Sequence, residues 1–319
     1  MTAHLGVDLG GTNFRIASFG TGFVPAAVHK EEVGEPRDPQ TIVERLAVAA
    51  EGLAPTGPVT FGVGIAAMLR DRRGTVANSP HLRWRDVAFG ELLAARLGPR
   101  FSVGVYNDVN AVVWGEAVAG AARGCRDVLG VYVGTGIGGG VIAGGQLIEG
   151  VSNCAGEIGH VKVRWEDDAA PCACGQRGCV EAYVGGSYVA KRIATELAAG
   201  ARSSAVRLAG GVEHVTPGHV DQAAGEGDEW ALALWSELAP LLAVTLGNAL
   251  ALLNPERLVL GGGLLGRTPV LYDLVETTLL VVTPVAISER LSVVPAELGD
   301  DAGLVGAAAL ARDRVSVIA

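Results

Sequence analysis

Residues 5–19 read LGVDLGGTNFRIASF, a pattern that predicts two strands joined by a glycine-rich turn. The apolar residues lie in Leu5–Gly10 and Phe14–Phe19, so the segment Asp8–Asn13 falls on a hairpin turn. Glycines there let the backbone approach a bulky anion and aim its N–H groups at it. Asp8 could hold Mg²⁺ through water, because that ion keeps part of its hydration shell. An ordinary glycine-rich β-turn explains the same residues, so both interpretations stay open at this point.

A second glycine-rich segment, GTGIGG at residues 134–139, follows an apolar strand at residues 128–133. It matches the dinucleotide fingerprint G-x-G-x-x-G, which requires a helix directly after it. The next residues, GVIAGGQLIEG, carry their own Gly-Gly turn and predict a hairpin, so this segment is a partner to the first turn. GGGLLG at residues 261–266 has the better context, between a strand and a helix, but a lone fingerprint is a weak signal. None of the three lysines follows a glycine, which excludes a P-loop.

Polar residues follow a short apolar strand at residues 102–106, where NDVN occupies residues 107–110 before a helix predicted at residues 111–119. Polar side chains at the carboxyl end of a strand commonly face a ligand in α/β proteins. Asp108 is therefore a candidate general base, and Asn107 a candidate for reading hydroxyl groups. Helix capping is the structural alternative, although two consecutive polar residues exceed what one cap requires.

Three cysteines lie within eight residues of the stretch 151–181, VSNCAGEIGHVKVRWEDDAAPCACGQRGCVE. With one upstream histidine they form a Cys₃His set, which suits a closed tetrahedral Zn²⁺ site. The predicted ligands are His160, Cys172, Cys174 and Cys179. A redox pair or loose surface thiols are the alternatives, and the C-x-C-x₄-C spacing favours zinc. Glu157 and Glu181 flank this set, and a four-ligand site leaves both carboxylates available for another task.

The composition describes a soluble globular protein long enough for two domains: 319 residues, 49% hydrophobic and 18% charged. With a net charge of −9 and no basic stripe, we expect no nucleic-acid partner. We expect no membrane segment or signal peptide, because the sequence lacks a run of about 18 apolar residues and its N-terminus lacks a charged-then-apolar pattern. Cys125 and Cys154 remain single, so the odd set of five cysteines favours a reducing cytoplasm.

The rest of the chain alternates strands and helices, without a convincing internal repeat. Further helices are predicted at residues 41–53, 89–97, 187–199, 228–253, 269–280 and 303–312. Further strands are predicted at residues 59–65, 257–260 and 291–295, with a hairpin tip at residues 71–74. The small residues GLVGAAAL of the last helix would let it pack closely on a sheet.

Taken together, these motifs resemble the ROK family of sugar kinases over nearly the whole chain. The resemblance rests on DLGGTN, NDVNAVVWGE, VGTGIGGGV, GEIGH, CACGQRGCVE and VLGGG, which begin at residues 8, 107, 133, 156, 172 and 259. It implies an α/β protein with the two-domain fold of actin, Hsp70 and hexokinase (ribonuclease H-like) and an interdomain cleft. The implied domains are residues 1–118 plus 302–319, and residues 119–301. The implied reaction is ATP-dependent phosphorylation of a hexose at its 6-hydroxyl, with glucose as the expected substrate.

The resemblance also implies residue roles. Asp108 would take the proton from the sugar 6-hydroxyl. The other ring hydroxyls would be bound by Asn107, Glu157, His160 and Glu181, with His160 also ligating zinc. The phosphates of ATP and its Mg²⁺ would lie among Asp8, Gly10, Gly11, Thr12, Asn13, Thr135 and Gly136. The adenosine would lie along Gly261, Gly262 and Gly263.

Two residues depart from the family pattern. Met68 stands where a glycine-containing turn would touch the sugar, and His81 stands where related sequences often carry Asn. Both weaken the choice of glucose over N-acetylmannosamine, N-acetylglucosamine, fructose or allose. A ROK sugar-sensing repressor is the rival class, but its N-terminal helix-turn-helix has no place before a strand that begins at Leu5. A NAD-dependent oxidoreductase would leave the hairpin at Asp8 unexplained. We expect a cytoplasmic homodimer or homotetramer that takes ATP, Mg²⁺ and a structural Zn²⁺.

Overall fold

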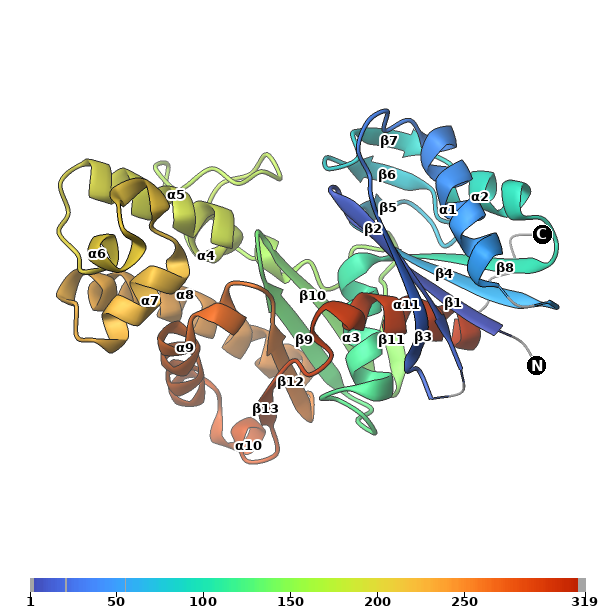
Figure 1. The fold of residues 1–319 in the computed structure, drawn as a ribbon. Helices are drawn as coiled ribbons and strands as arrows, with labels where there is room; N and C mark the ends of the chain where they lie inside the picture. The colour runs from blue at the N-terminus through green and yellow to red at the C-terminus, as the bar shows by residue number, and fades with distance from the viewer. Residues whose placement is uncertain (1–2, 21, 55, 315–319) are drawn as a thin grey trace. The chain divides into compact units, whose positions relative to one another are not determined.

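The computed structural model describes residues 3–20, 22–54 and 56–314. They form two compact units (Figure 1). The first comprises Met1–Arg126, Gly140–Gly156 and Ala296–Ala319, and the second comprises Asp127–Gly139 and Glu157–Pro295. The domain boundaries implied by the family resemblance, at residues 118/119 and 301/302, stay a prediction.

The first unit is built on a five-stranded sheet that opens with the hairpin predicted at residues 8–13. Its strand order is β3 (Pro25–Glu32), β2 (Asn13–Phe19), β1 (Ala3–Leu9), β4 (Val59–Ile65), β8 (Phe101–Asn107). The first three strands are antiparallel, whereas β1, β4 and β8 run parallel. Every residue of β4 is buried, as expected for a central parallel strand covered on both faces.

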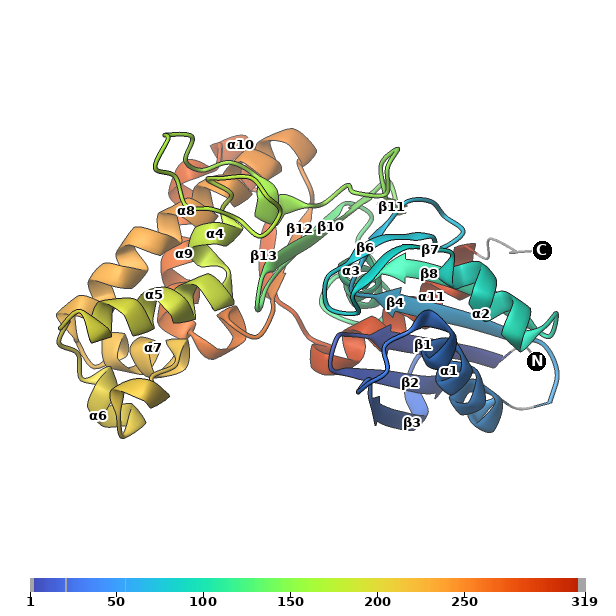
Figure 2. The same ribbon diagram turned by 90° about the horizontal axis from the view of Figure 1, so that it is seen from above.

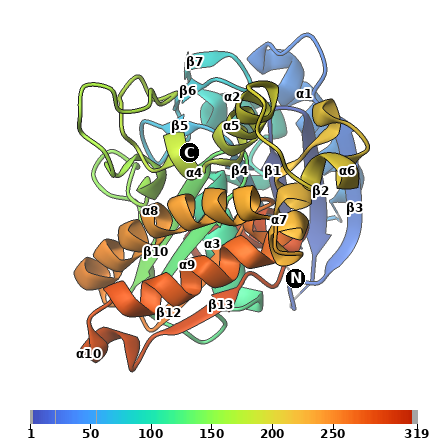
Figure 3. The same ribbon diagram turned by 90° about the vertical axis from the view of Figure 1, so that its left-hand side faces the viewer.

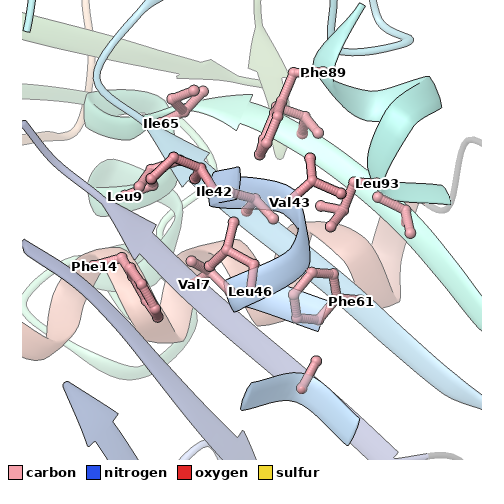
Figure 4. Packing of buried hydrophobic residues seen from close by; sticks show 14 of the residues in the cluster. Val7, Leu9, Phe14, Ile42, Val43, Leu46, Phe61, Ile65, Phe89 and Leu93 are labelled. Carbon is pink, nitrogen blue, oxygen red and sulfur yellow. The ribbon is translucent and has the colours of Figure 1, made fainter. Parts of the chain in front are cut away.

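One face of this sheet is covered by α1 (Pro39–Leu53) and α2 (Phe89–Leu97), as Figure 2 shows from above. Alternate side chains of the strands, such as Val7 and Phe61, pack there against Ile42 and Leu46 (Figure 4). Helix α1 begins where Asp38 accepts the N–H of Thr41 at 2.9 Å, ahead of a proline in the first turn.

The opposite face is covered by α11 (Ala302–Arg314), which also packs against α3 (Asp108–Ala119). The approach is close enough that a Cβ on Gly62 would lie 1.8 Å from the carbonyl oxygen of Ala307. A Cβ on Gly306 would lie 1.6 Å from the carbonyl oxygen of Ala111. The prediction that small residues let the last helix pack closely on a sheet is therefore confirmed.

A smaller sheet in the first unit carries the predicted hairpin tip at residues 71–74. It consists of β5 (Met68–Leu69), β6 (Val76–Ser79) and β7 (Trp84–Val87). Met68 lies on β5 with its side chain exposed, and the N–H of Gly74 closes the tip on the carbonyl of Asp71 at 3.3 Å.

The second sheet repeats the strand order of the first. Its order is β11 (Gln146–Ile148), β10 (Ile137–Ala143), β9 (Val128–Val133), β12 (Arg257–Gly261), β13 (Ser292–Pro295). In both sheets the first strand has its hairpin partner on one side and two parallel strands on the other. Residues 134–136 join β9 to β10 without a helix, so the hairpin interpretation is confirmed against the dinucleotide fingerprint. The two sheets therefore share one strand order, although no internal repeat is visible in the sequence.

Helices make up most of the second unit, and Figure 3 shows α8 and α9 side by side. They are α4 (Glu181–Val184), α5 (Gly186–Ala198), α6 (Ala205–Ala209), α7 (Pro217–Gly225), α8 (Glu229–Leu253), α9 (Pro269–Val282) and α10 (Val285–Ser288). Among the described residues, α8 alone is long and apolar enough to cross a membrane, by length and composition only. Its buried side chains, such as Trp235 and Leu242, also suit a core helix packed on α9.

Candidate functional site

The turn between β1 and β2 lines a cavity of about 310 Å³ in the first unit. The turn is closed by the N–H of Gly10, which donates to the carbonyl of Asn13 at 3.1 Å. The lining residues are Asp8, Gly10, Gly11, Thr12, Asn13, Arg15 and Lys30. The structure thus brings together the predicted phosphate-binding residues of this turn. It adds two cations, Arg15 and Lys30, which are cross-strand partners on β2 and β3.

Asp8 carries the acidic group of this cavity. Burial raises the pKa of its carboxyl above the ordinary value, and the nearby positive charge of Arg15 only partly opposes the effect. Arg15 is itself held in place, donating to the carbonyl of Asp300 at 2.6 Å and to the carboxylate of Asp301 at 2.5 Å. A desolvated carboxylate facing two cations and a glycine turn is a suitable outer ligand for a hydrated divalent cation.

Gly11 is required by a close neighbour from another part of the chain. A Cβ at this position would lie 2.5 Å from the Cβ of His81, nearer than real Cβ contacts allow. His81, one of the two departures from the family pattern, therefore lies directly against the first glycine turn. Its backbone carbonyl accepts a hydrogen bond from Arg37, which anchors the segment.

Asn107 and Asp108 lie at the carboxyl end of β8, at the start of α3. Asn107 is the N-cap of that helix: its side-chain oxygen accepts the N–H of Asn110 at 3.1 Å, and its amide donates to the carbonyl of Ala67 at 3.3 Å. The capping alternative thus holds for Asn107. Asp108 is the first residue of α3 and half-buried, at the positive end of the helix dipole.

In the second unit, the turn between β9 and β10 borders a cavity of about 560 Å³. Its lining residues are Gly134, Thr135, Gly186, Ser187, Thr216, Pro217, Gly218, Gly263, Leu264, Arg267 and Thr268. Of the predicted nucleotide-binding residues in this unit, Thr135 and Gly263 line the cavity. Gly136, Gly261 and Gly262, which were also predicted, are not among its lining residues. The sequence interpretation missed the contributions of α5, α7 and the turn before α9.

Gly262 explains why the two glycine segments of this cavity lie together. Its φ of +93° is in the region that favours glycine, and a Cβ there would lie 2.5 Å from the backbone of Val133. The N–H of Leu264 donates to the carbonyl of Val133 at 2.9 Å. Because β9 and β12 are neighbouring parallel strands, both segments follow strand carboxyl ends at the same sheet edge.

The four predicted zinc ligands converge in the second unit. Their candidate ligand atoms all lie within 4.8 Å of one another. The Sγ atoms of Cys174 and Cys179 are 3.7 Å apart, and Nδ1 of His160 lies 3.7 Å from Sγ of Cys172. A tetrahedral Zn²⁺ with Zn–S bonds of about 2.3 Å separates two sulfurs by about 3.8 Å, so the set fits zinc.

Lys162 supports this cluster from outside the ligand set. Its ammonium donates to Sγ of Cys179 at 3.1 Å and to the carbonyl of Arg177 at 2.7 Å. A Cys₃His set with Zn²⁺ carries one net negative charge, which a neighbouring ammonium offsets. Burial raises the pKa of the Cys172 thiol to about 12, so a bound metal must displace its proton.

The two flanking carboxylates have different surroundings. Oε2 of Glu157 lies 3.8 Å from Nε2 of His160, and burial raises the pKa of this carboxyl. Glu181 instead accepts, through Oε2, the N–H of Ile137 at 2.8 Å, directly after the glycine turn. Oε1 of Glu181 lies 3.6 Å from Sγ of Cys172. The ring of His160 thus presents Nδ1 to the cysteines and Nε2 to Glu157. This geometry is compatible with the predicted double role, in which one nitrogen ligates zinc and the other faces the sugar.

Two sheets of one topology, each with a glycine hairpin bordering a cavity, define an α/β protein of the actin/hexokinase-like class, as the resemblance implied. The ROK family pattern matches residues 4–314, and the chain belongs to the ROK family. It is 34% identical over 324 residues to the glucokinase of Streptomyces coelicolor, with 98% of each chain covered. It is 30% identical over 314 residues to the glucokinase of Thermotoga maritima, again with 98% of each covered.

A solved structure gives the same assignment. The ROK family glucokinase from Streptomyces griseus, in complex with glucose and AMPPNP, superposes with a TM-score of 0.78 at 31% identity. The match covers 98% of this chain and 99% of that one.

Proposed function

We propose that this chain is an ATP-dependent hexose kinase that transfers the γ-phosphoryl group to the 6-hydroxyl of glucose. The observation that carries the proposal is the pair of glycine hairpins, one in each sheet, with a cavity beside each. Phosphoryl transfer needs little covalent chemistry from the protein, so backbone N–H groups and fixed charges at the phosphates supply most of the catalysis. The kinase relatives support the same reaction.

The donor would occupy both glycine turns. We assign the adenosine to the cavity of about 560 Å³, a volume within the usual range for small-molecule sites. Thr216, Ser187 and Arg267 would read its polar edges there. The phosphates would lie against the turns at Thr135 and at Gly10–Asn13, with Lys30 as an added positive charge. Mg²⁺, held by Asp8 through water, would neutralise charge that develops on the phosphates.

The acceptor would be held by Asn107, Glu157, His160 and Glu181, the set that the family resemblance assigns to the ring hydroxyls. Asp108 would then remove the proton of the 6-hydroxyl as the oxygen attacks the γ-phosphorus. The bond from that phosphorus to the β–γ bridging oxygen breaks, and ADP leaves. The products are the sugar 6-phosphate, ADP and the proton that Asp108 returns to solvent.

Zinc would be structural in this scheme. A catalytic Zn²⁺ keeps an open position for water or substrate, whereas His160, Cys172, Cys174 and Cys179 would together fill all four positions. The metal would then fix the loop between Glu157 and Glu181, so that both carboxylates keep one orientation.

A coupled ADP-release assay across glucose, fructose, allose, N-acetylglucosamine and N-acetylmannosamine tests the function. We expect the highest kcat/KM for glucose, an absolute requirement for Mg²⁺, and sugar 6-phosphate equal to the ADP released. A higher kcat/KM for another hexose would show that the chain is a ROK kinase for that sugar and not a glucokinase. ADP release that no sugar stimulates would reject the kinase.

We further propose a cytoplasmic homo-oligomer. The support is that none of the five cysteines forms a disulfide, and that two neighbouring stretches of the chain carry no charge. Residues 238–255 and 277–288 contain no charged residue in a chain of net charge −9, so two copies could meet there without repulsion. The side chains of Leu252, Val281 and Val285 are 86%, 81% and 70% exposed on this surface. Light scattering of Val281→Glu should show a smaller mass than wild type, whereas an unchanged mass would reject this interface.

A further inference from the structure

The glycine turn of the second unit is held by the start of α5, which is separated from the candidate metal ligand Cys179 by the short helix α4. The N–H of Gly186 donates to the carbonyl of Gly134 at 2.9 Å. The N–H and Oγ of Ser187 both donate to the carbonyl of Thr135, at 3.0 and 2.9 Å. The N-terminus of α5 thus donates hydrogen bonds to two consecutive carbonyls of the turn, those of Gly134 and Thr135.

The other side of the turn is held by Glu181. Its Oε2 accepts the N–H of Ile137 at 2.8 Å, across 44 positions of sequence. The fit is tight, because a Cβ on Gly136 would lie 2.4 Å from the same Oε2. A charged acceptor makes this hydrogen bond stronger than a neutral one. The turn is therefore held at the carbonyls of Gly134 and Thr135 and at the N–H of Ile137, the first residue of β10.

Glu181 also contacts the metal-binding loop. Its Oε1 lies 3.6 Å from Sγ of Cys172, and only Val180 separates it from Cys179. Cys179 is fully buried, and the N–H of Val180 donates to the carbonyl of Val161 at 2.9 Å. One carboxylate therefore bridges the cysteine cluster and the glycine turn.

We propose that Glu181 is a positioning residue for the phosphate donor, and that the metal-binding loop controls donor affinity through it. The inference rests on the proposed function, which places donor phosphates against the turn at Thr135. A turn binds phosphate when its free N–H groups are already aimed at the anion, and the bond to Ile137 fixes that orientation. Loss of this hydrogen bond would make the turn more flexible. Donor binding would then be weaker, because it would have to order the turn at a cost in conformational entropy.

Donor binding without sugar isolates this role from sugar recognition. Titration calorimetry with Mg²⁺ and a non-hydrolysable ATP analogue should show about tenfold weaker binding for Glu181→Ala, the loss expected for a hydrogen bond to a charged group. Glu181→Gln should stay within about threefold of wild type, because its amide oxygen can still accept the N–H of Ile137. Glu157→Ala is the matched control: it flanks the same ligands without a contact to the turn, so its donor affinity should not change.

Hydrogen exchange gives a readout that is independent of activity. The Ile137 amide should exchange faster in Glu181→Ala than in wild type, and also faster after chelation of the metal or in Cys174→Ala. Cys154→Ala, a cysteine outside the cluster, should leave that rate unchanged. If the Ile137 amide exchanged as slowly in the metal-free protein as in wild type, the metal-binding loop would not control the turn, and the proposal would be wrong.

The result for Gly136→Val distinguishes failure of this inference from failure of the proposed function. If Gly136→Val loses donor binding while Glu181→Ala keeps it, the turn binds phosphate and Glu181 does not position it. If neither variant changes donor binding, the assignment of this turn to the nucleotide is itself wrong. Weak binding by both Glu181→Ala and Glu181→Gln, with normal exchange at Ile137, also counts against the positioning role.

Discussion

The carboxylate of Glu116 accepts the backbone N–H of Leu298 at 2.9 Å, across 182 positions of sequence. The same oxygen accepts the N–H of Glu297 at 3.0 Å, and the other oxygen accepts the N–H of Ala121 at 2.8 Å. The side chain is completely buried, so these three donors replace water around a charged group. Glu116 therefore joins the end of α3 to the segment that leads into α11.

Replacing Glu116 with Ala should lower the free energy of unfolding by about 3 kcal/mol, because three backbone N–H groups lose their shared buried acceptor. Urea denaturation measures this change. Glu297→Ala is the control, since that side chain is exposed and only its backbone N–H is used. Equal stability of the two variants would show that the buried carboxylate is not a significant anchor.

Asp8→Asn should raise thermal stability while it removes turnover. Because burial raises the pKa of this carboxyl, the folded protein binds the proton more tightly than the unfolded chain does. Ionised Asp8 therefore destabilises the fold at pH 7, and the cost disappears as the pH falls below the ordinary carboxyl pKa of about 4. We expect the Asp8→Asn variant to melt about 2 °C higher than wild type at pH 7, with a difference that shrinks on acidification. Asp168→Asn, at an exposed position, should show no such pH-dependent gain.

Local sequence signals predicted most of the individual elements. The helix predicted at residues 89–97 and the strand at residues 59–65 match α2 and β4 residue for residue, because apolar spacing and flanking turns define both. The edge strand β3 was missed because most of its residues are exposed and show no apolar alternation. The common strand order of the two sheets was not predictable from one sequence, since it depends on pairings between distant strands.

The residues of the candidate site also fall into two groups: those that local sequence spacing predicted, and those that only contacts between distant segments bring together. Residues 8–13 and the cysteine cluster are nearly contiguous in sequence, so their grouping could be predicted from spacing. Arg15 and Lys30 required the cross-strand register, and Arg267 required the packing of α7 beside the turn before α9. The hydrogen bond between Glu181 and Ile137 could not be predicted from the sequence, because the two residues lie 44 positions apart and meet only in the folded chain.

Asp108→Asn should reduce kcat by about 10²–10⁴-fold, the usual contribution of a general base. The amide keeps the shape of the carboxylate but cannot accept the proton of the sugar hydroxyl. Sugar affinity, measured by calorimetry, and the melting temperature should stay close to wild type. A variant that keeps more than about a tenth of the wild-type kcat would assign the base to another residue.

Gly11→Ala should impair donor use, because its new Cβ would lie 2.5 Å from the Cβ of His81 and displace the turn. We expect about a tenfold rise in the KM for ATP, typical of a misplaced phosphate site. A second substitution makes the test specific. Gly11→Ala combined with His81→Gly should recover ATP use, whereas Gly11→Ala with His81→Ala should not, since alanine retains the clashing Cβ. Equal recovery in both double variants would exclude this contact as the cause.

The metal site should hold one Zn²⁺ per chain, because the described residues supply a single set of four ligands. Elemental analysis should find no zinc in Cys174→Ala and a full complement in Cys125→Ala, whose thiol lies outside the cluster. Adding Zn²⁺ to chelated wild type in weak buffer should release protons, since the pKa of Cys172, raised to about 12 by burial, keeps that thiol protonated without metal. Zinc affinity should therefore fall as the pH is lowered. Zinc that binds without proton release, or that persists in Cys174→Ala, would contradict a Cys₃His site.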